Sequence, residues 1–272
     1  MRFKLHLQKV GTGNRLPINY QYELSAWIYK TLQSGDAAFS EWLHQNGYTV
    51  AGKQFRLFTF SQLFFPKNGY RVQGDRLLIQ SRDCWLEVGL MVDEAAQHFV
   101  LGIFKNQRLG IGDIKSVVDF EVKSVERLSV KRWEDSNRFR CLSPMCVAVR
   151  TIYNGKESQT YLSPTDEGYG EFLHKNLLNK WRAYQKNARP SLVESMESLP
   201  FEFRLLSSVK SRLVKIKAGT RQETKVRGFL FDFELVAPLE LLEVGYACGF
   251  GEKNAMGFGC VGRVEQSKNP PF

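Results

Sequence analysis

GYACGFGEKNAMGFGCV, residues 245–261, places five glycines in seventeen positions. Glycine reaches positive φ angles easily and leaves backbone N–H groups unshielded by a Cβ atom. Successive free N–H groups form a nest that binds anions, and phosphate is a natural guest. The segment therefore predicts an anion-binding loop at Gly249, Gly251, Gly257 and Gly259. Glycine-rich loops also occur as plain turns, and this one lacks the Gly-Lys-Ser/Thr of a Walker loop. The flanking sequence is therefore needed to assign a function to it.

The flanking residues place the segment between the last helix and the last strand of a recurring pattern. PLELLEVGYACG (238–249) begins with a proline, which suits the first position of a helix, and GFGCVGRV (257–264) is expected to be a strand. Upstream we expect a strand within 140–152, a long amphipathic helix after Asp166, and a long strand pair over 201–237. The order βαββαβ is that of a ferredoxin-like domain.

The first half of the chain shows the same pattern. Phe3–Gln8 alternates apolar and polar side chains, which predicts a strand, and a short helix is expected from Asp36 as N-cap to Gly47. The other expected elements are a helix at 19–33, strands at 55–65 and 69–81, a helix at 84–99 and a closing strand at 119–130. The sequence thus predicts an α+β chain of two tandem ferredoxin-like (RRM-like) domains, residues 1–132 and 138–272, joined by the polar stretch RWEDSNR.

The overall charge indicates a polyanionic partner. Thirty-eight basic and 28 acidic residues give a net charge of +10 and a pI near 9.4, and such domains commonly meet nucleic acid or anionic lipid. No run approaches the ~18 apolar residues of a membrane helix, and the N-terminus has no apolar signal region, so we expect a cytoplasmic protein without membrane contact. Five cysteines without a Cys-x-x-Cys pair and four scattered histidines predict reduced thiols and no metal or other cofactor.

Positive charge is densest in the expected strand pair of the second half. One acidic residue, Glu223, lies among eight basic ones: Arg204, Lys210, Arg212, Lys215, Lys217, Arg221, Lys225 and Arg227. A strand pair that turns near KAGT (217–220) would carry them as a cationic ribbon suited to an RNA backbone. Such side chains would set the affinity for RNA and its salt dependence but would not recognise the base sequence. A solvated basic hairpin is the alternative. The neighbouring Phe229, Phe231 and Phe233 are expected in the core.

Several segments together resemble one known family. VGYACGFGEKNAMGFGCV (244–261) looks like the C-terminal glycine-rich signature of the CRISPR-associated endoribonuclease that cuts precursor CRISPR RNA, the Cas six family within the RAMP superfamily. MRFKLHL (1–7) resembles its opening strand, PINYQYELSAWIYKTL (17–32) its first helix, and CLSPMCVAV (141–149) the strand that opens its second domain. These landmarks follow the family's order from residue 1 to about 264.

The resemblance implies a fold, an activity and a partner. The fold would be two tandem ferredoxin-like domains with a cleft between them. The activity would be a metal-independent endoribonuclease that cleaves within the repeat by attack of the RNA 2′-hydroxyl. It leaves a 2′,3′-cyclic phosphate and a 5′-hydroxyl and releases mature guide RNAs. The implied partners are CRISPR repeat RNA, as precursor and as guide, and a CRISPR effector complex, with monomer and homodimer both open.

A histidine and a tyrosine are the candidates for proton transfer. His44 lies in the last turn of an expected helix, and an imidazole can both take and give a proton near neutral pH. The resemblance places a catalytic histidine there. Tyr29 follows Ile28 of the apolar stripe, which turns it about 100° from the core. The resemblance gives Tyr29 a functional role, and a packing role is the alternative; which group is base and which is acid stays open.

The cation and the loop contacts depart from or extend the family pattern. Relatives often carry a lysine before LFTYS, whereas this chain has Arg56 before LFTFS and Lys53 three residues earlier. Arginine holds phosphate oxygens in bidentate fashion but does not release a proton, so both residues are candidates. The backbone of 245–259 is expected to run close to RNA phosphates, with Lys253 and Asn254 as polar contacts. Packing between the two domains is the alternative for this loop.

Two other functions compete with cleavage. A non-catalytic RNA-binding subunit of the same superfamily would hold guide RNA in an assembly, but His44 and Tyr29 beside a basic residue argue against it. A small-molecule enzyme on a ferredoxin-like fold would use the loop for a nucleotide phosphate, and the basic 204–227 ribbon counts against that.

Overall fold

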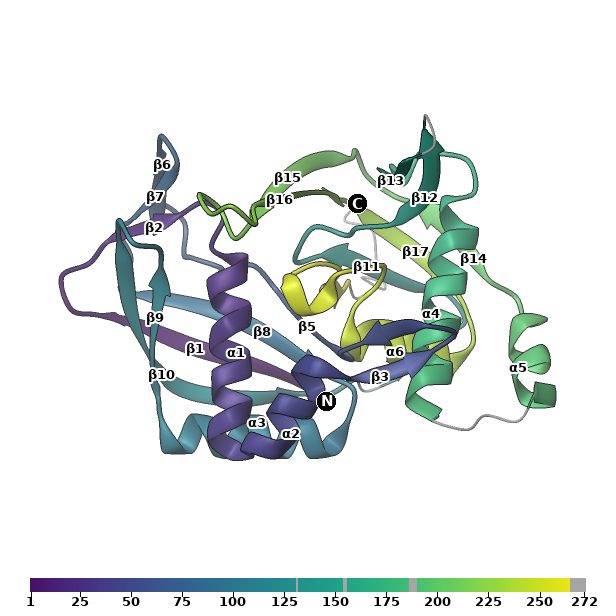
Figure 1. The fold of residues 1–272 in the computed structure, drawn as a ribbon, viewed down its shortest axis with the longest axis horizontal. Helices are drawn as coiled ribbons and strands as arrows, with labels where there is room; N and C mark the ends of the chain where they lie inside the picture. Colours follow the sequence, from purple (N-terminus) through teal and green to yellow (C-terminus); the bar gives the residue numbers. More distant parts are fainter. Residues whose placement is uncertain (131, 154–155, 186–189, 265–272) are drawn as a thin grey trace, which may run out of the picture.

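The computed structural model describes residues 1–130, 132–153, 156–185 and 190–264. Its main strands form two antiparallel sheets, one from each half of the chain, which lie side by side with helices packed on them (Figure 1). The fold is α+β, with two tandem ferredoxin-like domains as predicted. The end of the expected second domain, residues 265–272, lies outside the described residues.

The N-terminal sheet has the strand order β5-β8-β1-β10-β9. Its strands are β5 (Phe58–Phe60), β8 (Asp83–Leu90), β1 (Arg2–Val10), β10 (Val117–Leu128) and the added edge strand β9 (Arg108–Gly112). Without β9, this is the ferredoxin order, with the first strand between the third and the fourth. Phe3, Leu5 and Leu7 alternate along β1 and are buried, as their period of two predicts.

Three helices accompany this sheet. Helix α1 (Gln21–Gly35) packs against α3 (Asp93–Lys105). The two helices approach closely at Gly102, because this residue has no Cβ atom; one placed there would lie 1.8 Å from the Thr31 carbonyl oxygen. Between α1 and the sheet's second strand come α2 (Ala37–Gln45) and the small hairpin of β3 (Tyr48–Val50) and β4 (Lys53–Phe55). Asp36 begins α2 as predicted, since its carboxylate accepts a hydrogen bond from Phe39 N.

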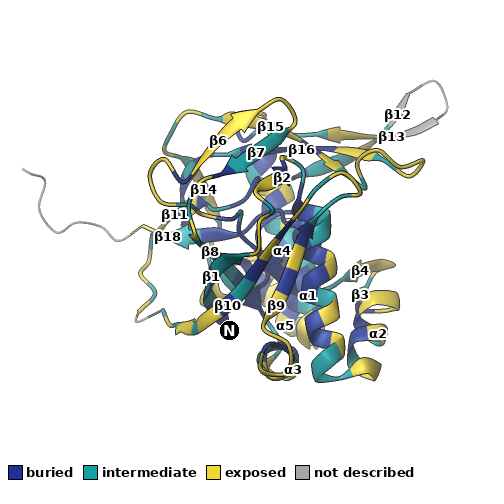
Figure 2. Ribbon diagram, turned by 90° about the vertical axis from the view of Figure 1, so that its left-hand side faces the viewer, coloured by how far each residue is buried: buried dark blue, intermediate teal, exposed yellow. Residues whose placement is uncertain are grey.

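Two expectations for the first half are wrong. Residues 84–90 belong to β8 and not to a helix, because Cys84, Leu86 and Val88 alternate into the core while the backbone pairs with β1 and β5. The helix begins only at Asp93. The expected strand at 69–81 lies outside the main sheet as a hairpin of β6 (Tyr70–Gln73) and β7 (Arg76–Ile79), which pairs with β2 (Arg15–Pro17). Strand β6 is exposed along its whole length (Figure 2).

The C-terminal sheet repeats the ferredoxin order as β14-β17-β11-β18. Its strands are β14 (Glu202–Leu205), β17 (Asp232–Val236), β11 (Asn137–Cys141) and β18 (Val261–Arg263), and its helices are α4 (Tyr169–Gln185), α5 (Pro190–Glu197) and α6 (Leu239–Cys248). Two hairpins are inserted: β12 (Ala148–Tyr153) with β13 (Lys156–Tyr161), and β15 (Lys210–Ile216) with β16 (Thr224–Leu230). The strand pair expected over 201–237 is therefore two pairs, because only its outer ends join the sheet.

A fully buried arginine joins the two halves behind the N-terminal sheet. Arg2, on β1, donates hydrogen bonds to the carbonyl oxygens of Tyr246 and Val261 and contacts Cys260 Sγ at 2.7 Å. Its guanidinium lies 4.3 Å from the centre of the Tyr246 ring, and the Glu87 carboxylate is 3.5 Å away. The charge of this buried cation is therefore compensated by a carboxylate and by several acceptors.

Candidate active site and RNA-binding surfaces

A cleft of about 1250 Å³ lies between the two halves of the chain. From the N-terminal half it is lined by parts of α1, α2 and the β3–β4 hairpin, and from the C-terminal half by β12, β13, α4 and the glycine-rich segment 249–260. The cleft brings together four predicted catalytic candidates from separate places in the sequence: Tyr29, His44, Lys53 and Arg56. It is the place where an extended anionic strand can meet groups able to transfer a proton.

Tyr29 and His44 are neighbours because α2 packs on α1. The Ser40 hydroxyl on α2 donates to the Tyr29 carbonyl oxygen at 3.0 Å, which ties the two helices together. The ring centres of Tyr29 and His44 are 5.1 Å apart and meet edge to face, and Tyr29 also packs on Phe58 at 5.3 Å. His44 is exposed in the last turn of α2, as predicted, and Tyr29 is half-buried.

The burial of Tyr29 fixes its protonation state. Removal from water raises the pKa of Tyr29 to about 12, although the nearby Arg56 guanidinium acts in the opposite direction. The phenol therefore keeps its proton at neutral pH and is a hydrogen-bond donor. Its charged form would be a very small fraction under ordinary conditions.

Arg56 and Lys53 differ in what they contact. Arg56 donates from Nη2 to the His44 carbonyl oxygen at 2.6 Å and from Nη1 to that of Asn46 at 3.2 Å. These are the last carbonyls of α2, so the guanidinium satisfies the helix end and fixes the residue that carries the imidazole. Gly47, with φ of +60°, leaves room for it, since a Cβ atom there would lie 2.5 Å from Nη1. Lys53 is exposed on β4, and no described residue pairs with its ammonium.

The backbone of the glycine-rich segment binds the protein itself. The N–H groups of Gly249, Gly257 and Gly259 donate to the carbonyl oxygens of Gly245, Asn254 and Pro144. The expectation that these three amides form a free nest is therefore wrong. The glycines are needed for close packing: a Cβ atom on Gly259 would lie 1.9 Å from the Phe250 carbonyl oxygen. The Asn254 side chain, predicted as an RNA contact, donates instead to the Phe250 and Phe258 carbonyls, both at 3.0 Å.

The same segment connects the two halves (Figure 1). On the N-terminal side, the Ser25 hydroxyl on α1 donates to the Ala255 carbonyl oxygen at 2.6 Å, and that of Thr59 on β5 donates to Phe258 O at 3.0 Å. On the C-terminal side, Lys180 Nζ on α4 contacts the carbonyl oxygens of Gly249 and Gly251. These contacts show the packing role that the sequence left as an alternative. Contact of Gly251 and Lys253 with RNA stays a prediction, and both residues line the cleft.

Seven of the eight predicted basic residues lie on the β15–β16 hairpin or its turn, and all but the half-buried Lys217 are exposed. Lys215 stands directly opposite Lys225 in the register, and Arg227 stands opposite the half-exposed Leu213. The eighth residue, Arg204, lies on β14 and pairs with the Glu234 carboxylate. The hairpin is thus a separate cationic surface, and the prediction that it binds RNA is untested by these contacts.

The aromatic residues beside the hairpin are core residues, as predicted. Phe229, Phe231 and Phe233 are 7, 3 and 0% exposed, so none is available as a platform for stacking a base. The hairpin turn instead touches the other half of the chain: Lys215 N donates to Asn19 Oδ1 at 3.0 Å, and Lys217 Nζ lies 5.8 Å from the centre of the Tyr22 ring.

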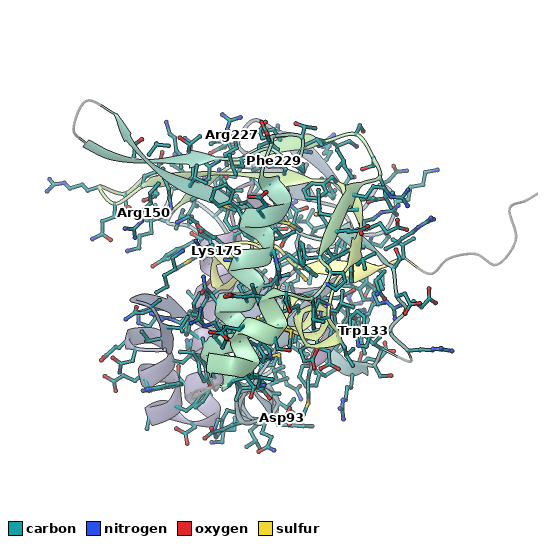
Figure 3. The ribbon with its side chains drawn as sticks, turned by 90° about the vertical axis from the view of Figure 1, so that its right-hand side faces the viewer. Asp93, Trp133, Arg150, Lys175, Arg227 and Phe229 are labelled. Atoms are coloured by element: carbon teal, nitrogen blue, oxygen red, sulfur yellow. The ribbon has the colours of Figure 1, made fainter. Side chains whose placement is uncertain are left out.

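Sequence reasoning missed the cleft residues on β12, β13 and α4. Arg150 and Gln159 stand opposite each other on the β12–β13 hairpin, and Lys175 lies on α4. Figure 3 shows Arg150 and Lys175 on the same side of this half. No motif marks these positions. Lys180 had a signal, since it interrupts the apolar stripe of α4 that includes Leu177 and Trp181, and it is 2% exposed.

Several predicted absences can be compared with the described residues. All five cysteines are free and buried, as expected. Among the residues that the structure describes, no group of three or more His, Cys, Asp or Glu side chains is placed to hold a metal ion. No helix in the described ranges is both long and apolar enough to cross a membrane.

Known proteins match this chain over almost its whole length. CRISPR-associated endoribonuclease Cas6 1 of Methanocaldococcus jannaschii is 29% identical over 269 residues, which cover 97% of this chain and 93% of that protein. CRISPR-associated endoribonuclease Cas6 of Pyrococcus furiosus is 27% identical over 270 residues, with coverages of 98% and 91%. A solved structure described as a Cas6-related gene product of Pyrococcus furiosus superposes with a TM-score of 0.78 at 27% identity, covering 98% of this chain and 99% of that one.

Family models account for both halves. The model for the C-terminal part of the CRISPR-associated protein Cas6 matches residues 127–262, and the model for the N-terminal part of Cas6 matches residues 15–125. The resemblance seen in the glycine-rich segment and the first helix is thereby confirmed. The chain belongs to the Cas6 family of CRISPR-associated proteins.

Proposed function

We propose that the chain is a metal-independent endoribonuclease that cleaves precursor CRISPR RNA within its repeat and so produces mature guide RNAs. Relatives over the full length are named CRISPR-associated endoribonucleases, which supports RNA cleavage in general. The observation that carries the finer proposal is the pairing of Tyr29 with His44, 5.1 Å apart, at a cleft lined by basic side chains.

The chemistry needs no group beyond the RNA and the side chains. The 2′-oxygen attacks the adjacent phosphorus while its proton is removed, and the bond from phosphorus to the 5′-oxygen breaks as that oxygen gains a proton. The products are a 2′,3′-cyclic phosphate and a 5′-hydroxyl. The negative charge that builds on the phosphoryl oxygens must be stabilised by donors and cations held in place beforehand.

The site assigns these tasks to different residues. The proton transfers fall to His44, because an exposed imidazole at the cleft can accept a proton and return one. With a pKa near 12, the hydroxyl of Tyr29 keeps its proton and donates a hydrogen bond to a phosphoryl oxygen. The base role that the sequence left open between the two groups therefore goes to His44.

The cation roles divide between Lys53 and Arg56. The Arg56 guanidinium donates hydrogen bonds to the carbonyl oxygens of His44 and Asn46, so it positions the end of α2. Its positive charge also acts to lower the pKa of Tyr29. Lys53 lines the same cleft, its ammonium pairs with no residue that the structure describes, and it is the residue we assign to the phosphate. This division explains how an arginine can stand where relatives often have a lysine.

The test is cleavage of end-labelled repeat RNA in EDTA by wild type, His44→Ala and His6→Ala. We expect one cut by wild type, no cut in RNA with a single 2′-deoxy nucleotide at the scissile position, and a loss of about a hundredfold or more in His44→Ala. His6→Ala is the matched control, because His6 pairs with Asp83 on the N-terminal sheet outside the cleft, and its rate should be that of wild type.

Two outcomes would contradict the proposal. Binding without cleavage would make the chain a non-catalytic RNA-binding subunit. Cleavage only after addition of a metal ion, or cleavage of the 2′-deoxy RNA, would show a different nuclease mechanism.

A further inference from the structure

Lys180 is a buried cation at the floor of the cleft. It lies on α4, its side chain is 2% exposed, and it still lines the cleft together with Cys248 and Gly251. Its Nζ donates to the carbonyl oxygens of Gly249 at 2.5 Å and Gly251 at 2.6 Å. The residue thus holds the glycine-rich segment where the two halves of the chain meet.

These two bonds leave the charge of Lys180 unexplained. An ammonium has three N–H donors, and within the described residues only two of them have an acceptor. No described carboxylate lies within 4 Å of Nζ, and burial lowers the pKa of Lys180 to about 8. A neutral amine would still supply two N–H groups to two carbonyls, so support of the segment requires the donors and not the charge.

The other deeply buried cation shows what compensation looks like. Arg2 has the Glu87 carboxylate at 3.5 Å, two carbonyl acceptors and an aromatic ring against its guanidinium. Among the described residues, Lys180 has two carbonyl oxygens as its hydrogen-bond acceptors, and the Glu252 carboxylate acts on it only from beyond ion-pair distance. Because a buried charge is costly unless it is fully compensated, the comparison leaves one N–H donor and part of the charge of Lys180 without a partner among the described residues.

We propose that Lys180 binds a phosphate of the RNA strand that occupies the cleft, through the third N–H and the charge of its ammonium. The proposal rests on the proposed function, because RNA is the anion that brings the phosphate. The cleft suits it: Lys53, Arg150, Lys175 and Lys253 also line the walls, and Glu252 is the single carboxylate among the described lining residues.

The proposal makes RNA affinity depend on pH in a defined direction. A bound phosphate favours the ammonium, so it raises the pKa of Lys180 above its value of about 8 in the free protein. The affinity for RNA is then highest well below pH 8 and falls as the pH rises through 8 and 9, because Lys180 must take up a proton when RNA binds. Between pH 7.5 and 9 this weakens binding by roughly tenfold.

Other titratable groups near Lys180 are accounted for. Cys248 on α6 and Glu252 in the segment act on it directly, and burial raises the pKa of the Cys248 thiol. Strand β3, also packed on α4, brings Tyr48, whose pKa is about 12. Glu197 on α5 acts on His174 instead. The remaining cleft lysines contribute equally to wild type and to a Lys180 variant, so a comparison of the two isolates Lys180.

The experiment measures the dissociation constant of uncleavable repeat RNA, with one 2′-deoxy nucleotide, at pH 7.5 to 9 and at several salt concentrations. Wild type should weaken roughly tenfold over this range. Lys180→Met should bind about tenfold more weakly at pH 7.5, lose most of the pH dependence and reduce the salt slope by about 0.7, the value for one phosphate contact on a single strand. Lys175→Met, on the same helix in the same cleft, should reduce the slope but keep the pH dependence.

The outcomes separate this inference from the proposed function. If wild type binds repeat RNA with the same affinity at every pH, or if Lys180→Met keeps the full salt slope, Lys180 only supports the segment and the inference is wrong while RNA processing stands. If wild type binds no repeat RNA, both fail together. Should Lys180→Met not fold, Lys180→Gln, which retains an N–H donor pair without the charge, takes its place in the same comparison.

Discussion

The glycine-rich segment 249–260 and the β15–β16 hairpin were both predicted to meet RNA, and the fold treats them in opposite ways. The segment is mostly buried, its carbonyl oxygens accept hydrogen bonds from side chains of α1, β5 and α4, and it lies where the two halves meet. The hairpin is a cationic ribbon whose basic side chains, except the half-buried Lys217, are exposed. The segment shapes the cleft, whereas the hairpin adds a separate charged surface beyond it.

This difference shows which sequence signals translate directly into a surface. A cluster of lysines and arginines has to stay in water, because burial of so many charges would be too costly. Glycine has no such requirement. The same freedom of φ that lets a backbone reach a phosphate also lets it approach another backbone, as Gly251 does at Cys146, where a Cβ atom would lie 2.3 Å from the carbonyl oxygen.

Replacing one glycine by alanine in each region tests whether the segment is packed and the hairpin is not. Gly259→Ala combines a φ of +72° with a Cβ atom 1.9 Å from Phe250 O. Left-handed strain and overpacking together should lower the free energy of unfolding by roughly 3–5 kcal/mol. Urea unfolding followed by circular dichroism measures the loss.

Gly219→Ala is the matched control on the hairpin turn. Gly219 has nearly the same φ, +75°, but nothing lies within 4 Å of the added Cβ atom. Its cost should be the strain alone, roughly 1–2 kcal/mol. Equal losses in the two variants would show that the segment is not packed as described.

The hairpin should give the reverse result, with lost affinity and an unchanged fold. Replacement of Lys215, Lys225 and Arg227 by glutamine removes three exposed charges from one face of the hairpin. The slope of log affinity for repeat RNA against log salt should fall by about 2, and binding at physiological salt should weaken by tenfold or more. Filter binding at four salt concentrations provides the measurement.

The unfolding free energy controls for damage by the triple variant. Lys215 and Lys225 are opposite each other, and Lys215 Nζ also lies 3.7 Å from the Glu223 carboxylate. The triple substitution therefore removes one repulsion and one exposed ion pair, and it should leave stability within about 0.5 kcal/mol of wild type. If the triple variant keeps the full salt slope, the hairpin is not part of the RNA-binding surface. If its free energy of unfolding falls well below that of wild type, the charges support the fold instead.

Local periodicity predicted most of the elements but not all of their partners. The alternation in β1, the N-cap at Asp36 and the last helix after Pro238 are short-range patterns, and each element forms where expected. Residues 84–90 were predicted as the start of a helix, although Val88, Gly89, Leu90, Met91 and Val92 form an uninterrupted run without polar side chains. That run is apolar because β8 lies between β1 and β5 and packs against α6, which local pattern does not reveal.

The site divides in the same way. His44 at the end of α2 and Tyr29 beside the apolar stripe could be identified from the sequence, with the help of the family resemblance. Lys180 carries a weaker signal, its place in the apolar stripe of α4, but its contacts could not be predicted, because Gly249 and Gly251 are about 70 residues away and only the fold brings them together. Long-range contacts of this kind decide whether a lysine is a surface charge or a buried ligand.

A smaller effect is expected for Lys180, which holds the buried glycine-rich segment: its contribution to the free energy of unfolding should depend on pH. Its pKa is about 8 in the folded chain, below the ordinary 10.5, so the unfolded chain binds more protons between these values. The contribution of Lys180 to the free energy of unfolding therefore rises with pH in this window. The difference between wild type and Lys180→Met should increase by about 1 kcal/mol from pH 8 to 9, and a flat difference, like that expected for the Lys175→Met control, would contradict it.

The smallest expected effect tests where the cationic surface ends. Arg204 belongs to the same basic run in sequence as Arg227, but it lies on β14 and shares the Glu234 carboxylate with Arg138. Within the described ranges, Arg227 donates a hydrogen bond to the Ser211 hydroxyl and pairs with no carboxylate. Because a charge already paired with a carboxylate has little left for a phosphate, Arg204→Gln should change RNA affinity less than twofold, whereas Arg227→Gln should reduce the salt slope by about 0.7. Equal slopes in the two variants would extend the RNA-binding surface from the hairpin onto the C-terminal sheet.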